Sequence, residues 1–293
     1  MKITITGSIG NIGKPLAKQL IASGHEVTIV SSSEDRKKEI TAMGATAAIG
    51  TVSDQAFLVQ AFAGADAVYS MTPPNMGGQN VVINTSEAGK TLAAAVQQSG
   101  VKRVVMLSSI GAELASGTGP IAGIHPIEQY FNELEGVAVT ILRAGYFYTN
   151  FYNDVPLIKG MGIIGSNFSG DTILPLAHPR DIANAIATEL TITNAKSKDL
   201  QYVISDYRSA ADVAKAIGTA IGKPELPWIE FTDEQLLEGM VQAGLPAEIA
   251  ALYVGMGNAL GEGKLQKDFL AAGAPVHGSI SLEDFAKEFA AQF

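Results

Sequence analysis

Residues 4–13 read Thr-Ile-Thr-Gly-Ser-Ile-Gly-Asn-Ile-Gly, and this stretch decides the fold. Its three glycines, Gly7, Gly10 and Gly13, lie between an expected strand that starts at Lys2 and an expected helix that starts at Asn11. Glycine lets a backbone turn sharply and approach a ligand closely, and a helix N-terminus offers unpaired amides and a partial positive charge. The pattern predicts a phosphate-binding turn; the alternative is a tight strand–helix turn that binds nothing.

A second apolar segment, Glu26–Val30, completes a βαβ unit around this turn and strengthens the prediction. The same alternation continues through the first half of the chain. Expected strands are Lys2–Thr6, Glu26–Val30, Thr46–Ile49, Ala67–Met71, Arg103–Ser108 and Ala138–Leu142. Expected helices are Asn11–Ser23, Glu34–Met43, Ser53–Ala63, Glu87–Ser99 and Pro126–Glu135, with a glycine directly after four of them (Gly24, Gly44, Gly64 and Gly100).

Apolar strands separated by helices predict an α/β fold, a doubly wound parallel sheet of the Rossmann type. We expect this domain to cover residues 1–150, with 175–205 returning to it. Residues 151–174 are rich in Gly, Asn and aromatics and look irregular. Together with 206–293, where Ser281 is expected to cap a final helix, they predict a smaller, mainly helical substrate or lid domain.

The bulk composition excludes several classes of function. A net charge of −9 argues against a nucleic-acid surface, and no stretch is long and apolar enough to span a membrane. The absence of cysteine excludes disulfides, thiolate metal sites and cysteine nucleophiles. The four histidines are scattered, so no metal is expected. We expect a soluble, cytoplasmic protein.

The end of the second expected strand bears on the choice of cofactor. An acidic residue there holds the ribose 2′-hydroxyl of NAD, but this chain has Ser31 and two further serines. Hydroxyls and nearby cations suit a 2′-phosphate, and Arg36, on the next helix, is the first candidate to pair with it. The pattern favours NADP (NADPH) over NAD. Alternatively, Arg36–Lys38 form a solvated helix face against Glu34 and Asp35.

Several segments together resemble the NmrA-like group of atypical short-chain dehydrogenases/reductases. This group includes NADPH-dependent quinone and dye reductases and nucleotide-sensing regulators. The similarity covers nearly the whole chain. The matching segments are Thr6–Gly13, Thr72-Pro-Pro-Asn75, Leu107-Ser-Ser-Ile-Gly-Ala112, Leu142-Arg-Ala-Gly-Tyr-Phe147, His178-Pro-Arg-Asp-Ile-Ala183 and Leu282-Glu-Asp-Phe285.

The resemblance implies a set of NAD(P)-binding residues. The turn with Gly7, Ser8, Gly10, Asn11 and Ile12 would hold the pyrophosphate. The ribose and nicotinamide would lie against Met71, Thr72, Pro73, Ser108, Ser109, Gly145 and Tyr146. Thr51 stands where the family often has an acidic residue that contacts the adenine, which puts that contact in doubt.

Two of these segments have a simpler interpretation. Thr72-Pro-Pro also suits a turn that ends a strand, since proline blocks continuation of the ladder. Tyr146 and Phe147 also suit a core or a domain interface, as do Phe151 and Tyr152, because large rings are usually buried.

Typical short-chain dehydrogenases use a Tyr-x-x-x-Lys pair, in which Lys lowers the pKa of the Tyr phenol. This chain contains no such pair. On spacing, His125 and Gln129 take the two places, and Gln cannot supply the positive charge of Lys. His125 is the candidate proton donor, because a histidine titrates near neutrality. Alternatively, His125 only begins the helix before Pro126.

Two functions follow from these observations. The first is an NADPH-dependent oxidoreductase that passes hydride to a conjugated acceptor, such as a quinone or an azo or related dye, which needs little acid catalysis. The alternative is a non-catalytic NAD(P)-sensing regulatory protein of the NmrA type. Expected partners are a small-molecule acceptor and, for a sensor, a protein partner or a second copy of the chain. No nucleic acid or membrane partner is expected.

Overall fold

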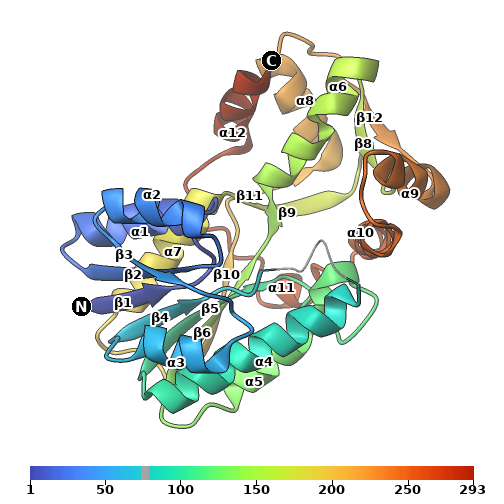
Figure 1. Cartoon of the computed structure of the whole chain (residues 1–293). Coiled ribbons are helices and arrows are strands. Elements are labelled where there is room, and N and C mark those ends of the chain that lie inside the picture. Colours follow the sequence, from blue (N-terminus) through green and yellow to red (C-terminus); the bar gives the residue numbers. More distant parts are fainter. Residues whose placement is uncertain (74–78) are drawn as a thin grey trace. The chain divides into compact units, whose positions relative to one another are not determined.

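The computed structural model describes residues 1–73 and 79–293, and the chain divides into two compact units (Figure 1). The first unit comprises 1–109, 123–143 and 182–201; the second comprises 110–122, 144–181 and 202–293. The segments 110–122, 144–150 and 175–181 cluster with the second unit, whereas the sequence predicts all three as parts of the dinucleotide-binding domain.

A seven-stranded sheet forms the centre of the first unit, in the order β3-β2-β1-β4-β5-β6-β10. The strands are β1 (Lys2–Ile5), β2 (Glu26–Ser31), β3 (Thr46–Ile49), β4 (Ala67–Ser70), β5 (Arg103–Ser109), β6 (Ala138–Ala144) and β10 (Lys198–Val203). The pairs β1–β2, β1–β4, β2–β3 and β4–β5 are parallel. The predicted Rossmann-type parallel sheet is confirmed.

Helices cover both faces of this sheet, with α1, α2 and α7 on one side and α3, α4 and α5 on the other (Figure 1). Their bounds are α1 (Gly13–Ala22), α2 (Lys37–Ala42), α3 (Gln55–Phe62), α4 (Val81–Ser99), α5 (His125–Asn132) and α7 (Pro179–Thr191). The four glycines expected after helices all adopt positive φ, between 71° and 87°, which a side chain would disfavour. These glycines end the helices as predicted.

Helix α4 begins at Val81, six residues before the predicted start at Glu87. The β-branched run Val81-Val82-Ile83 has low helix propensity, which hid the first turns from sequence reasoning. Val81 is 1% exposed in the core of the first unit, and burial of this kind overrides propensity.

The second unit combines helices with two small sheets. Its elements are β7 (Tyr146–Phe147), α6 (Val155–Met161), β8 (Ile164–Ser166), β9 (Ile173–Ala177), β11 (Asp206–Ser209), α8 (Ala210–Ala220), β12 (Trp228–Glu230), α9 (Asp233–Gln242), α10 (Ala247–Gly261), α11 (Lys267–Ala271) and α12 (Leu282–Phe289). Aromatic stacking marks its core, where the Tyr148 and Phe285 rings lie 4.7 Å apart at 9°. Ser281 caps α12 as predicted, accepting a hydrogen bond from the Asp284 amide.

The expectation that residues 151–174 are irregular is wrong. They contain α6, β8 and the start of β9. The two strands are short and pair with residues far along the chain: β8 with β12, and β9 with β11 and β7. Such pairing leaves no local signal, because the partners meet only in the folded unit.

Among the described residues, none of the helices combines the length and apolar character needed to cross a bilayer.

Candidate functional site

The strand order of the first unit reverses direction between β1 and β4. In open α/β sheets, ligands bind outside the carboxyl ends of the strands at this reversal. The glycine turn follows β1 directly, and Met71 follows β4. Topology therefore brings together two predicted site segments that lie far apart in the sequence.

Thr6 connects the glycine turn after β1 to Met71 after β4 by hydrogen bonds. Its hydroxyl donates to the Met71 carbonyl at 2.9 Å and accepts from the Met71 amide at 2.8 Å. Gly7, with φ of +86°, packs so tightly against Met71 that an added Cβ would lie 2.2 Å from the Met71 methyl group. The positive φ requires glycine at this position, whereas the Met71 side chain could shift to relieve the contact.

Ser8 and Ser31 join the ends of β1 and β2. The Ser8 amide donates to the Val30 carbonyl at 3.1 Å, and the Ser8 hydroxyl donates to the Ser31 hydroxyl at 2.9 Å. Both serines are buried, and Ser8 holds a left-handed φ of 59°. The structure therefore brings Ser8 and Ser31 together, and the hydrogen bond between their hydroxyls connects the glycine turn to the end of β2.

The two remaining glycines of the turn have different reasons to be glycine. A Cβ on Gly13 would lie 2.0 Å from the Ser8 carbonyl oxygen, so internal packing forbids it. A Cβ on Gly10 would meet only the Gly7 carbonyl oxygen, at an ordinary 3.7 Å. The fold itself tolerates a Cβ at Gly10, so internal packing does not require glycine at this position. Asn11 and Ile12 complete the turn, and no side chain of the described residues caps α1, which leaves its first amides for an anion.

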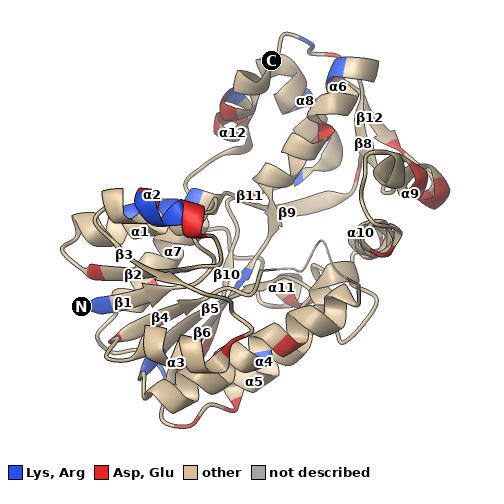
Figure 2. Ribbon diagram, in the orientation of Figure 1, with Lys and Arg blue, Asp and Glu red and all other residues tan. Residues whose placement is uncertain are grey.

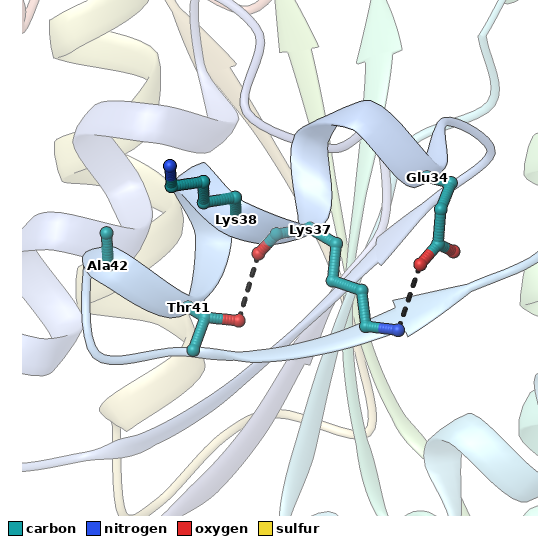
Figure 3. A pocket seen from close by; sticks show the side chains of 5 residues that line it. All are labelled: Glu34, Lys37, Lys38, Thr41 and Ala42. Carbon is teal, nitrogen blue, oxygen red and sulfur yellow. Dashed lines mark hydrogen bonds and ion pairs between the residues drawn. The ribbon is translucent and has the colours of Figure 1, made fainter.

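The cations near the end of β2 differ in their pairing. Lys14 pairs with Glu39 at 2.7 Å, and Lys37 pairs with Glu34 at 2.9 Å. Arg36 lies in the 3₁₀-helix η1 (Glu34–Arg36), exposed, and forms no ion pair with any residue that the structure describes. Figure 2 shows basic and acidic residues together on α2, and Figure 3 shows the Lys37–Glu34 pair at the edge of a surface hollow. A 2′-phosphate would therefore have to compete with a carboxylate for Lys14 and for Lys37, but not for Arg36.

The segment after β4 is described only in part. Met71 and Thr72 are half-buried and Pro73 is exposed. Pro74 and Asn75, which belong to the matched Thr72-Pro-Pro-Asn75 segment, lie outside the described residues.

Sequence reasoning missed a buried charged cluster beneath Ser108. The Ser108 hydroxyl donates to Glu128 Oε1, and Arg143 binds the same carboxylate through both of its oxygens, at 2.9 and 2.7 Å. Side-chain exposure is 6% for Arg143 and 8% for Glu128. The sequence feature that could have revealed this cluster is Arg143 itself. It is a charged residue in an otherwise apolar strand, and a buried charge needs a partner. Because its proton is donated to Glu128, Ser108 offers a neighbouring ligand only its lone pairs.

His125 and Gln129 lie on one face of α5, as the spacing predicts. Their Nε2 atoms are 2.8 Å apart. The side chains of His125 and Gln129 are therefore hydrogen-bonded to one another across one turn of the helix. His125 is half-buried and is the first residue of α5. This geometry fits the start of a helix as well as the proposed proton donor.

Gly145 and Tyr146 belong to the second unit. A Cβ on Gly145 would lie 2.3 Å from the Pro175 carbonyl oxygen, so packing within this unit already requires glycine there. Tyr146 is partly buried, with its ring 5.4 Å from that of Phe151. Phe151 is 2% exposed, which confirms its expected place in a core.

Comparison with known proteins agrees with this geometry. A family model described as NAD(P)H-binding matches residues 7–151. The matched region contains the glycine turn, the β4 end, Ser108 and Tyr146. The expected relationship to NmrA-like atypical reductases is confirmed by this match together with the structural neighbours below.

Two curated relatives share 27% identity with this NAD(P)H-binding chain. One is the uncharacterized oxidoreductase YesF of Bacillus subtilis, aligned over 264 residues, or 89% of this chain and 85% of YesF. The other is agroclavine dehydrogenase of Claviceps fusiformis, aligned over 172 residues. That second alignment spans only 57% of the length of each protein.

Two solved structures share the fold over almost the entire chain. The triphenylmethane reductase of Citrobacter sp. superposes with a TM-score of 0.82 at 20% identity, over 99% of this chain and 100% of that one. An NADPH-dependent quinone oxidoreductase from Escherichia coli gives 0.80 at 19% identity, over 98% of both chains. In general terms, these comparisons support an NAD(P)H oxidoreductase.

Proposed function

We propose that this protein is an NADPH-dependent reductase that passes hydride to a conjugated acceptor, either a quinone or a dye. The observation that supports the proposal is the glycine turn at the point where the strand order reverses, between β1 and β4. The fold would accommodate a Cβ on Gly10 of this turn. The neighbours with the same fold include quinone and triphenylmethane dye reductases. Hydride transfer is the chemistry that a bound nicotinamide supplies; the protein orients it and excludes water.

The choice of NADPH over NADH rests on the end of β2. No carboxylate follows β2 directly, and Arg36 is exposed and unpaired among the described residues. A guanidinium binds a phosphate through two parallel hydrogen bonds, which an NADH ribose cannot offer. The Citrobacter reductase has been crystallised with NADP(H), in agreement with this preference.

Replacement of Arg36 by Ala is expected to weaken NADPH binding by roughly 10- to 50-fold and NADH binding by less than about twofold. The reason is that Arg36 would contact only the 2′-phosphate. Calorimetric titration of both nucleotides measures the effect, with Lys37→Ala as the matched control because Lys37 already pairs with Glu34. Equal losses for the two nucleotides would place the 2′-phosphate elsewhere.

A conjugated acceptor suits the residues of this site. The chain has no Tyr-x-x-x-Lys pair, so it lacks the acid that ketone reduction requires. The phenol of Tyr146 does not replace that acid. Burial, followed by the charges of Asp154 and Tyr253, raises the pKa of this phenol above its ordinary value, which makes it a weaker proton donor. Quinones and cationic dyes spread the incoming charge over their own rings and need less assistance.

The proposed activity is tested by following the absorbance of NADPH at 340 nm with the purified protein, first with menadione and then with crystal violet. We expect turnover with at least one of the two, and slower turnover with NADH. Tight NADPH binding without turnover of either acceptor, or of a wider panel, would favour the alternative, a nucleotide sensor. The absence of a Tyr-x-x-x-Lys pair is the observation that favours this alternative.

A further inference from the structure

A series of hydrogen bonds connects the glycine turn to the segment that carries Arg36. The Ser8 hydroxyl donates to the Ser31 hydroxyl at 2.9 Å, and Ser31 Oγ also accepts from the Ser33 amide at 3.3 Å. The Ser33 carbonyl accepts from the Arg36 amide at 3.3 Å, in the single turn of η1. All four residues belong to the first unit, so this connection lies within one compact body.

The Ser31 hydroxyl has no hydrogen-bonding capacity left for a ligand. A hydroxyl group donates one hydrogen bond and accepts two. Ser31 Oγ accepts from the Ser8 hydroxyl and the Ser33 amide, and it donates to the Ser33 carbonyl at 3.5 Å. Ser31 is also only 2% exposed. Because phosphate oxygens need donors, a 2′-phosphate would find none on this side chain.

The conformation of the glycine turn depends on the same hydroxyl. Ser8 has a φ of 59°, in the left-handed region that residues with a Cβ rarely adopt. Two hydrogen bonds hold it there: its amide donates to the Val30 carbonyl at 3.1 Å, and its hydroxyl donates to Ser31. The Ser8 carbonyl packs against the start of α1, where a Cβ on Gly13 would lie 2.0 Å from its oxygen. Ser31 therefore helps to fix the turn from which the α1 amides point.

We propose that Ser31 is a positioning residue that couples the pyrophosphate-binding turn to the Arg36 segment, which binds the 2′-phosphate. This inference rests on the proposed function, in which NADPH is the cofactor. Ser31 itself does not contact the nucleotide. Its hydroxyl holds Ser8 on one side and Ser33 on the other, so the turn and the backbone of Arg36 keep a fixed separation before the ligand arrives. Such preorganisation raises affinity because less freedom is lost on binding.

Ser31→Ala removes the hydroxyl and should loosen both sides of the connection. We expect the Kd of NADPH to rise about 10-fold and that of NADH about threefold, because NADH uses the turn but has no 2′-phosphate for Arg36. Calorimetric titration of the purified protein with each nucleotide measures both values. Ser99→Ala is the matched control: the Ser99 hydroxyl donates to the Val96 carbonyl at 2.9 Å in α4 of the same unit, and its loss should change neither affinity.

A double-mutant cycle with Arg36→Ala shows whether Ser31 acts through Arg36. In the Arg36→Ala background, Ser31→Ala should raise the Kd of NADPH only about threefold, the same factor as for NADH. A direct contact between Ser31 and the 2′-phosphate predicts instead that Ser31→Ala leaves the NADH affinity unchanged. That result, or an equal NADPH loss with and without Arg36, would overturn the proposal.

Hydrogen exchange supplies a readout that needs no bound nucleotide. In Ser31→Ala the Ser33 amide loses its acceptor and the carbonyl bonded to Arg36 loses its anchor, so both amides should exchange about tenfold faster. Unchanged exchange at both amides would contradict the inference. If Ser31→Ala does not fold, Ser8→Gly breaks the same bond from the other side, and glycine adopts a φ of 59° without strain. That variant should raise the Kd of both nucleotides about threefold, and unchanged affinities would again contradict the inference.

The outcomes also distinguish this inference from the function on which it rests. If the unmodified protein prefers NADPH and Ser31→Ala binds both nucleotides as before, the cofactor assignment stands and the role of Ser31 is wrong. If the unmodified protein binds neither nucleotide, both are wrong. Circular dichroism of Ser31→Ala shows whether the variant is folded, so that a lost affinity is not mistaken for a lost fold.

Discussion

Replacement of Arg143 by Met is expected to lower the free energy of unfolding of the protein by about 3–5 kcal/mol. The Arg143 side chain is 6% exposed and binds both oxygens of the Glu128 carboxylate. Removal of the cation would leave Glu128 as a buried charge with only the Ser108 hydroxyl to stabilise it. The same change should loosen Ser108, a predicted cofactor contact. Urea unfolding followed by circular dichroism measures the loss.

Two comparisons make this prediction specific. Lys37→Met removes an exposed ion pair and should change stability by no more than about 0.5 kcal/mol. The double variant Glu128→Gln with Arg143→Met removes both charges, so it should recover at least half of the loss. If the double variant is as unstable as Arg143→Met alone, the cost comes from lost packing and not from an unpaired carboxylate.

Replacement of Gly10 by Ala is expected to weaken binding of NADPH and NADH alike by at least about 100-fold, or about 2.8 kcal/mol, while the unfolding transition stays in place. The fold has room for this methyl group, since its nearest neighbour is the Gly7 carbonyl oxygen at 3.7 Å. The methyl group would instead occupy the space that the pyrophosphate needs at the turn. Fluorescence titration with both nucleotides measures the loss.

Two other glycines serve as controls for this variant. Gly13→Ala places a methyl group 2.0 Å from the Ser8 carbonyl oxygen, so it should destabilise the protein as well as weaken binding. Gly239→Ala in α9 meets no atom within 4 Å, so it should leave nucleotide affinity unchanged and raise stability by roughly 0.5–1 kcal/mol through helix propensity. Normal nucleotide affinity in Gly10→Ala would show that the pyrophosphate does not lie against this turn.

Sequence reasoning succeeded where the signal is local. The turn at Gly7–Gly13, the alternation of strands and helices, and the helix-ending glycines all follow from neighbouring residues, because backbone geometry, periodicity and capping act over a few positions. The same holds for His125 and Gln129, which one helical turn brings together. The role of Arg36 as partner of a 2′-phosphate stays a prediction, made from its position shortly after β2 in the sequence.

Tertiary structure decided everything that depends on partners distant in sequence. The strands β8 and β9 escaped notice because their partners, β12 and β11, lie far away in the sequence. The pairing of Glu128 with Arg143 likewise arises only when separate elements meet.

By itself, the sequence determined the α/β class, the anion-binding turn and the family, since these are written in short-range pattern. The folded chain decided which cations near β2 are already paired, which carboxylate is buried against an arginine, and which glycines the packing itself requires. Those properties are set by burial and by contacts across elements, which no local pattern records.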